Sequence, residues 1–130
     1  MSTQHHDARL WSRLTRAAQQ EVAAVLAALP REVRDRLAKL PITFEPEPNA
    51  AMVASGFDAD RTLGLFTAMP SEGTSEGPQR LPQVILFLDN IRDYVRGDVA
   101  EFRTQVRRTL LEEVGRYLGL DEDGGVVRDI

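Results

Sequence analysis

The sequence element that decides the fold is DVAEFRTQVRRTLLEEVGRYL, residues 98–118. Its apolar side chains recur at steps of three and four residues, which is the period of an amphipathic helix: Val99, Phe102, Val106, Leu110, Val114 and Tyr117. Asp98 is expected to cap the start of this helix, with Glu101 three residues on, and Gly119 is expected to end it. The sequence therefore predicts a long C-terminal helix with one apolar face.

Two further helices are expected before any strand. Apolar residues follow the helical period from Asp7 to Leu29, and Asp7 suits an N-cap position. A second, shorter helix is expected over Arg31 to Leu40, because Pro30 favours a helix start and Pro41 discourages continuation.

Three segments indicate strands of a small sheet. Residues 42–48 alternate in polarity but contain prolines, so they predict a short edge strand. Residues 63–69 predict a second strand, and the apolar run 84–88 predicts a third strand that is covered on both faces. Between the first two, Asn49 is expected to cap a brief helix, which Gly56 ends. Residues 70–82 are rich in Gly, Pro and Ser and predict a flexible surface loop.

Length and composition favour one globular domain over residues 1–130, of the α+β class. Within it, residues 1–6 are expected to be flexible and residues 121–130 to form a polar tail. The formal net charge is −4 and the basic residues are spread among acids, which argues against a nucleic-acid partner. The absence of cysteine excludes disulfides, thiolate nucleophiles and cysteine-ligated metals. No apolar signal core or membrane-spanning run is found, so we expect a soluble cytoplasmic protein without a membrane partner.

The segment LEEVGRYLGL, residues 111–120, carries a family resemblance. It resembles the motif helix of the compact bacterial zincin-like metallopeptidases, which reads His-Glu-x-Gly-His-x-x-Gly-Leu and is followed by acidic residues. Glu113 matches the catalytic glutamate of that pattern, whereas Glu112 and Arg116 stand where the two histidines would be. Three further positions match: Gly115, Gly119 and Leu120. The upstream order of two strands, separated by a loop and followed by the motif helix, is also similar. The resemblance implies a zincin-like fold with N-terminal helices, a small mixed sheet and a long C-terminal motif helix.

The two replaced histidines decide what this resemblance implies for chemistry. In the family pattern, two imidazoles one helical turn apart hold zinc while the glutamate between them activates a metal-bound water. A carboxylate at Glu112 is able to ligate a metal, but the guanidinium of Arg116 is always charged and has no lone pair to offer. We therefore expect no cofactor. Arg108, Glu112 and Arg116 are spaced four apart, which predicts a ladder of ion pairs along one helix face.

Three functional hypotheses follow. The leading one is a catalytically impaired relative of the metallopeptidases that binds a peptide or an anionic ligand in the inherited cleft through Arg116, with Glu113 retained at the general-base position. The second is an active metal-dependent hydrolase, in which Glu112 and Glu122 hold the cation and Glu113 is the general base. The third is a structural domain whose charged helix face is merely solvated. His5 and His6 lie in the expected flexible terminus, and the acids at 121–123 are read as a solvated turn.

Overall fold

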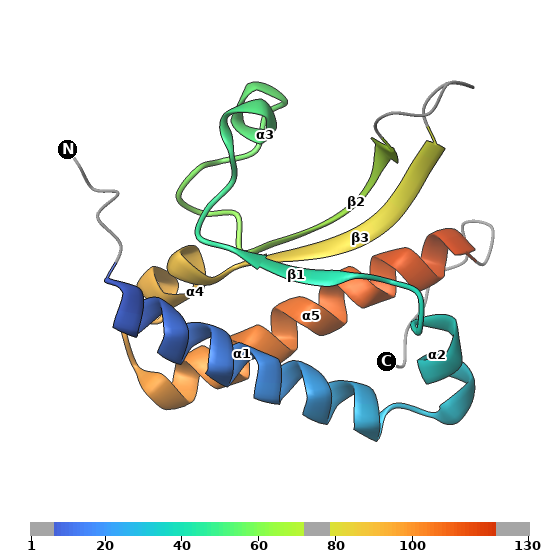
Figure 1. The fold of residues 1–130 in the computed structure, drawn as a ribbon, viewed down its shortest axis with the longest axis horizontal. Helices are drawn as coiled ribbons and strands as arrows, with labels where there is room; N and C mark the ends of the chain where they lie inside the picture. Colours follow the sequence, from blue (N-terminus) through green and yellow to red (C-terminus); the bar gives the residue numbers. More distant parts are fainter. Residues whose placement is uncertain (1–6, 72–78, 122–130) are drawn as a thin grey trace.

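The computed structural model describes residues 7–71 and 79–121, which fold into helices around a three-stranded sheet (Figure 1). In chain order the elements are α1 (Ala8–Ala28), α2 (Arg31–Arg36), β1 (Ile42–Glu45), α3 (Ala50–Ala54), β2 (Gly64–Ser71), β3 (Gln79–Phe87), α4 (Leu88–Tyr94) and α5 (Val99–Asp121). The predicted α+β class is confirmed, with helices first and a long helix at the end. None of the helices described is long and apolar enough to cross a membrane.

The sheet is mixed, and its strand order is β1-β3-β2. β1 pairs with β3 in parallel, from Ile42 opposite Val84 to Glu45 opposite Phe87. β2 pairs with β3 antiparallel, with Gly64 opposite Leu86. β2 is therefore an edge strand, and one side of its backbone is free to meet groups other than a strand.

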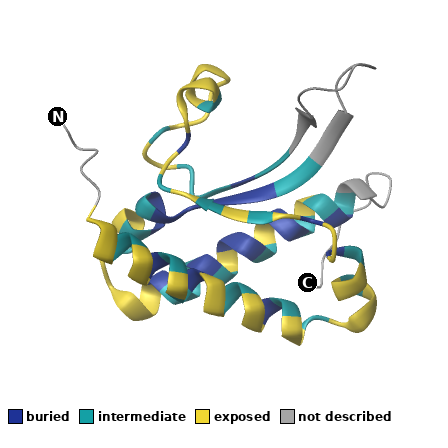
Figure 2. Cartoon of the chain, viewed as in Figure 1, coloured by how far each residue is buried: buried dark blue, intermediate teal, exposed yellow. Residues whose placement is uncertain are grey.

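The core lies where α1 and β3 meet α5, and Figure 2 shows the buried positions on these three elements. Val84 and Leu86 of β3 point into this main core, whereas Ile85 and Phe87 join a smaller cluster with Leu65, against which Met52 of α3 packs. The prediction that both faces of this strand are covered is thus confirmed for Val84 to Phe87. Leu88, which closes the apolar run, is instead the first residue of α4.

Local capping follows the sequence closely. The Asp7 carboxylate accepts hydrogen bonds from the backbone N–H groups of Arg9 and Leu10, and Asn49 accepts one from Met52. Asp98 accepts one from the N–H of Glu101, at 2.9 Å. These bonds satisfy donors that a helix start leaves unpaired, so short-range chemistry alone fixes where the three helices begin.

Several predicted bounds are corrected. The second helix ends at Arg36 and not at Leu40, because Leu37 closes it through bonds to the preceding carbonyls. The long helix does not end at Gly119 but continues to Asp121, so Asp121 is not part of a tail. Residues 1–6 and 122–130, for which flexibility and a tail are predicted, lie outside the described residues.

The predicted loop over residues 70–82 is wrong at both ends, because β2 runs through Ser71 and β3 starts at Gln79; residues 72–78 lie outside the described residues. The N–H of Phe87 donates to the carbonyl of Leu63 opposite, so hydrogen-bonded pairs alternate from there along the ladder. Pro70 and Pro82 fall on the intervening pairs, where a missing N–H costs no bond between β2 and β3.

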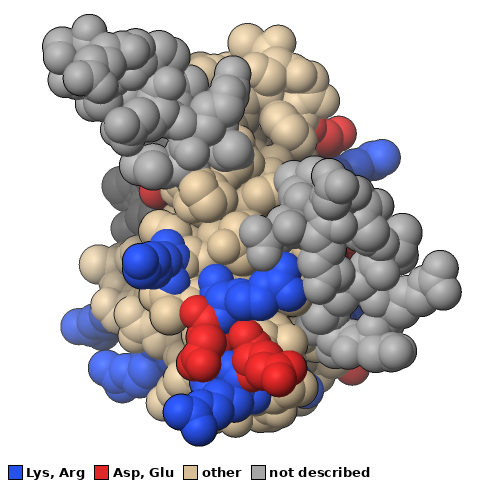
Figure 3. All heavy atoms as spheres, turned by 90° about the vertical axis from the view of Figure 1, so that its right-hand side faces the viewer, with Lys and Arg blue, Asp and Glu red and all other residues tan. Residues whose placement is uncertain are grey.

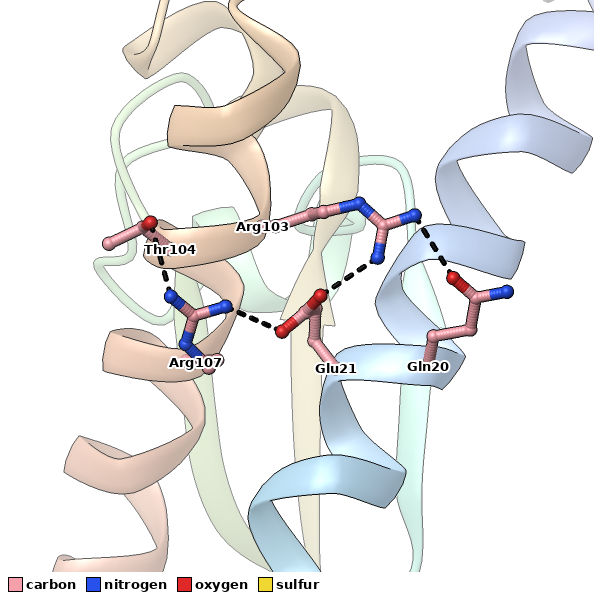
Figure 4. Close-up of polar contacts among 5 residues, drawn as sticks. All are labelled: Gln20, Glu21, Arg103, Thr104 and Arg107. Atoms are coloured by element: carbon pink, nitrogen blue, oxygen red, sulfur yellow. Dashed lines mark hydrogen bonds and ion pairs between the residues drawn. The ribbon is translucent and has the colours of Figure 1, made fainter.

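Polar contacts also join α1 to α5 (Figure 4). Glu21 of α1 accepts a hydrogen bond of 2.8 Å from Arg103 and one of 2.6 Å from Arg107, both on α5. Arg103 also donates to Gln20, and Arg107 donates to Thr104. The hydrogen bonds from the two arginines lower the pKa of Glu21 below its ordinary value of 4.5. This network therefore stabilises the packing of the two long helices when Glu21 is ionised.

Candidate functional site

The centre of the candidate site is the carboxylate of Glu113, which lies between α5 and the edge strand β2. Glu113 is buried, with 3% of its surface exposed. The backbone N–H of Phe66 donates to Oε1 of Glu113 at 2.8 Å. Phe66 stands opposite Val84 at a position of the ladder where its N–H points away from β3. Glu113 therefore accepts a hydrogen bond from an N–H at the edge of the sheet, where no neighbouring strand among the described residues is present to accept it.

Arg116 is the second group at this carboxylate. Its Nη1 lies 3.4 Å from Oε2 and 3.5 Å from Oε1 of Glu113. The Arg116 side chain is 67% exposed and that of Glu113 is 5% exposed, so a solvated guanidinium covers a buried acid. Such a long, half-solvated pair contributes little free energy, but it places a fixed positive charge between the buried carboxylate and solvent.

Gly64 of β2 and Thr109 of α5 lie where the edge strand packs closely against the helix that carries Glu113. A Cβ added to Gly64 would lie 2.5 Å from Cγ2 of Thr109 and 3.4 Å from Cγ of Glu113, so β2 approaches α5 as closely as a glycine permits. Thr109 is buried one turn before Glu113 and its Oγ1 accepts a hydrogen bond from Gln105. Sequence reasoning missed Gly64, Thr109 and Phe66, although the spacing of four between Thr109 and Glu113 already put these two on one helix face.

Among the described residues, the other predicted site residues form no hydrogen bond or ion pair with this carboxylate. Glu112 and Arg108 are exposed on α5, and within residues 7–71 and 79–121 neither forms an ion pair with Arg116 or with the other. The predicted ion-pair ladder is therefore wrong, because the buried Glu113 attracts Arg116 across three residues in place of Glu112 across four. Glu122 and both histidines lie outside the described residues.

The end of the molecule that carries α2 and the C-terminal part of α5 shows basic and acidic side chains interleaved (Figure 3). No extended area of one sign is visible on this face among the residues drawn in colour.

Burial sets the protonation of Glu113. Desolvation raises the pKa of this carboxyl above its ordinary value of 4.5, and the charge of Glu112 raises it further. The Arg116 charge and the Phe66 N–H act in the opposite direction without cancelling the effect of burial. Glu113 therefore holds its proton more tightly in the folded chain than in the unfolded chain.

The sequence profile of the zincin-like metallopeptidases matches residues 37–124, which is more than half of the chain and includes the whole sheet and α5. The chain belongs to this family. The profile begins within the turn after α2, so the family match includes β1, β2, β3 and the motif helix but not α1. A search of curated proteins finds no significant match.

Within residues 7–71 and 79–121, the side chains around Glu113 do not fit the zinc ion that the zincin-like family implies. Arg116 offers only N–H donors where a metal needs a lone pair, and its guanidinium faces Glu113. Among the residues described, no three His, Cys, Asp or Glu side chains are grouped closely enough to hold a metal ion. Oε1 of Glu113 already accepts the N–H of Phe66.

The pKa shift of Glu113 gives a prediction with a definite sign. Because the folded pKa is raised, the free energy of unfolding falls as the pH rises from about 4.5 through the folded value. Glu113→Gln removes this titration and keeps an acceptor for Phe66. We expect the free energy of unfolding of this variant, relative to that of the unmodified chain, to increase by on the order of 1 kcal/mol as the pH rises from 4 to 8. Urea unfolding measures this difference.

Glu21→Gln is the matched control, since the pKa of Glu21 is lowered. Glu21 adds stability that is present above 4.5 and is lost as the pH falls through its folded pKa. The Glu21→Gln variant should therefore be the less stable protein at neutral pH, and the difference should shrink in acid. A stability difference for Glu113→Gln that stays constant or falls with rising pH contradicts the assignment of a buried, destabilised carboxylate.

Proposed function

We propose that this protein is a zincin-like family member that has lost zinc-dependent peptide hydrolysis and acts by binding a peptide-like or anionic ligand beside Arg116. The observation that carries the proposal is the pairing of Arg116 with the buried carboxylate of Glu113, at 3.4 Å. It puts a guanidinium and its fixed charge at the helix position from which the family pattern presents a zinc ligand.

The hydrogen-bond donors beside the Glu113 carboxylate support the loss of hydrolysis. A general base must be within hydrogen-bond reach of the water that it deprotonates. Here one oxygen of Glu113 is bound by the Phe66 N–H and both lie next to Arg116 Nη1. Glu112, the other replaced ligand, is an exposed carboxylate one residue before Glu113 in the chain.

The same geometry supports ligand binding. The Arg116 side chain is 67% exposed, so its planar guanidinium has donors left for a ligand carboxylate while it covers Glu113. β2 is the neighbouring edge strand. Glu113 already holds the N–H of Phe66, but beyond that residue an extended peptide can pair with the strand edge through backbone hydrogen bonds. A peptide with an acidic side chain or terminus near Arg116 satisfies both features.

The test combines metal, turnover and binding measurements on untagged protein. Metal content is measured after equilibration with zinc, and cleavage of a mixed peptide library is followed by mass spectrometry with and without zinc. Binding of the same library is measured for the unmodified chain, for Arg116→Gln and for Arg108→Gln, a matched loss of charge two turns earlier on α5. We expect no zinc-dependent cleavage. We expect acidic peptides to bind, with affinity at least about tenfold lower in Arg116→Gln only.

Two outcomes would reject the proposal. Zinc-dependent cleavage by the unmodified chain that disappears in Glu113→Gln would favour the active hydrolase, with a metal held by Glu112 and Glu122. Peptide binding that is absent, or equally weakened in Arg108→Gln, together with no cleavage, would favour a structural domain without a ligand site.

A further inference from the structure

A separate groove of about 560 Å³ lies along α1, beside the end of α4 and the start of α5. In Figure 1 these parts lie at the end of the molecule opposite α2 and the C-terminal part of α5. None of Glu112, Glu113 and Arg116 lines the groove. It is therefore distinct from the family site, and an inference about it does not depend on the function proposed above.

The floor of the groove is apolar. Leu10, Leu14 and Ala17 follow one another on α1 at steps of four and three residues and so form a single stripe. Phe102 and Val99 of α5 line the opposite side, and Val99 is 72% exposed. A large apolar side chain that borders an apolar groove and faces water is a feature of surfaces that bind a partner.

The rim of the groove is positive. Four arginines line it, Arg13 and Arg16 from α1, Arg92 from α4 and Arg103 from α5, and none of the described residues that line it is acidic. This local sign opposes the net charge of the chain, which is −4. Arg103 already pairs with Glu21, whereas the other three form no ion pair with any residue in the ranges 7–71 and 79–121. Their charges are thus free to attract an acidic partner.

We propose that this groove binds an amphipathic helix of a partner protein, with leucine-like side chains on one face and aspartate or glutamate on its flanks. The lining part of α1, from Leu10 to Gln20, extends roughly 15 Å, which matches about three turns of a partner helix. The three arginines without an ion pair among the described residues come from different parts of the groove, with Arg92 on α4 and Arg13 and Arg16 on α1. A small anion with a single charged group would not need arginines from both helices.

The test uses a fluorescein-labelled helical peptide of about 16 residues, with leucines at helical spacing and glutamates on the flanks, and its counterpart with lysine in place of glutamate. Anisotropy is measured against the full chain, against Arg13→Glu/Arg16→Glu and against Val99→Asp. The matched control is Arg9→Glu/Arg31→Glu, which changes the net charge equally at exposed positions outside the groove. All substituted residues are exposed, so circular dichroism should show an unchanged fold.

We expect the glutamate peptide to bind at least about tenfold more tightly than the lysine peptide. Its affinity should fall at least about tenfold in both groove variants and stay unchanged in the control. Equal binding of the two peptides, or equal weakening in the control, would overturn the proposal. Vesicles with anionic lipid that compete for the same arginines would assign the groove to a membrane surface. Self-association that Val99→Asp abolishes would assign it to a second copy of the chain.

Discussion

Replacing Glu112 and Arg116 together by histidine is expected to raise the zinc affinity of the chain on the order of 100-fold. Both residues are exposed on α5 and four apart, so the new imidazoles would face the same side without disturbing the core. The exchange also removes the guanidinium that lies 3.4 Å from Glu113 and frees that carboxylate toward solvent. The affinity is measured by competition with a chelator, and the geometry by the absorption spectrum of the cobalt complex.

The control for this experiment is Arg108→His/Glu112→His, which has the same spacing one turn earlier on the same exposed side of α5. It can chelate zinc locally but cannot use the surroundings that the family pattern places around positions 112 and 116. An equal gain in affinity for both double variants would mean that any helix with this spacing gives the effect. A larger gain at 112 and 116 supports a scaffold that still suits the metal and lacks only its two ligands.

Gly64→Ala is expected to lower the free energy of unfolding by about 2–3 kcal/mol. The new Cβ would lie 2.5 Å from Cγ2 of Thr109, which is 2% exposed and cannot easily move. Relief of the clash would have to separate β2 from α5, the contact that also brings the Phe66 N–H to Glu113. Urea unfolding monitored by circular dichroism measures the loss.

A double-mutant cycle with Thr109→Ser isolates the cause. Serine lacks the clashing Cγ2 but keeps the Oγ1 that accepts the hydrogen bond from Gln105, so it should restore most of the stability of Gly64→Ala. Gly115→Ala is the matched glycine control. Nothing lies within 4 Å of its added Cβ, and alanine in a helix should stabilise the chain by about 0.5–1 kcal/mol. The interpretation fails if Thr109→Ser restores no stability. It also fails if Gly64→Ala and Gly115→Ala change the free energy of unfolding in the same direction.

The prediction from sequence was best where short-range chemistry acts alone. The predicted N-caps at Asp7, Asn49 and Asp98 are confirmed. They can be predicted because each capping hydrogen bond joins groups two or three residues apart. The strand at Val84–Phe87 was recognisable from its continuous apolar run, and the family from the motif helix. In each case the pattern depends on neighbours in the chain.

The predictions from sequence were wrong or incomplete where contacts between distant segments determine the local structure. The prolines at 70 and 82 predicted a loop, but in the hairpin both occupy positions that need no N–H toward the partner strand. Helix α4 was missed, and its buried Asn90 donates to the carbonyls of Ala59 and Thr62, some 30 residues earlier in the chain. Neither outcome can be read from a local pattern.

The sequence by itself determined the long helix, the capped starts of three helices and the identity of the groups at positions 112 and 116. An arginine lacks a lone pair in any fold, so its presence at position 116 weighs against zinc whatever packs around it. Only the tertiary structure decided the state of Glu113. Its hydrogen bond to Phe66 joins residues 47 apart, and its burial under β2 both raises its pKa and draws Arg116 away from Glu112. The burial of a side chain and the presence of an edge-strand N–H beside it arise only when distant segments pack together. These two features determine what this carboxylate can do.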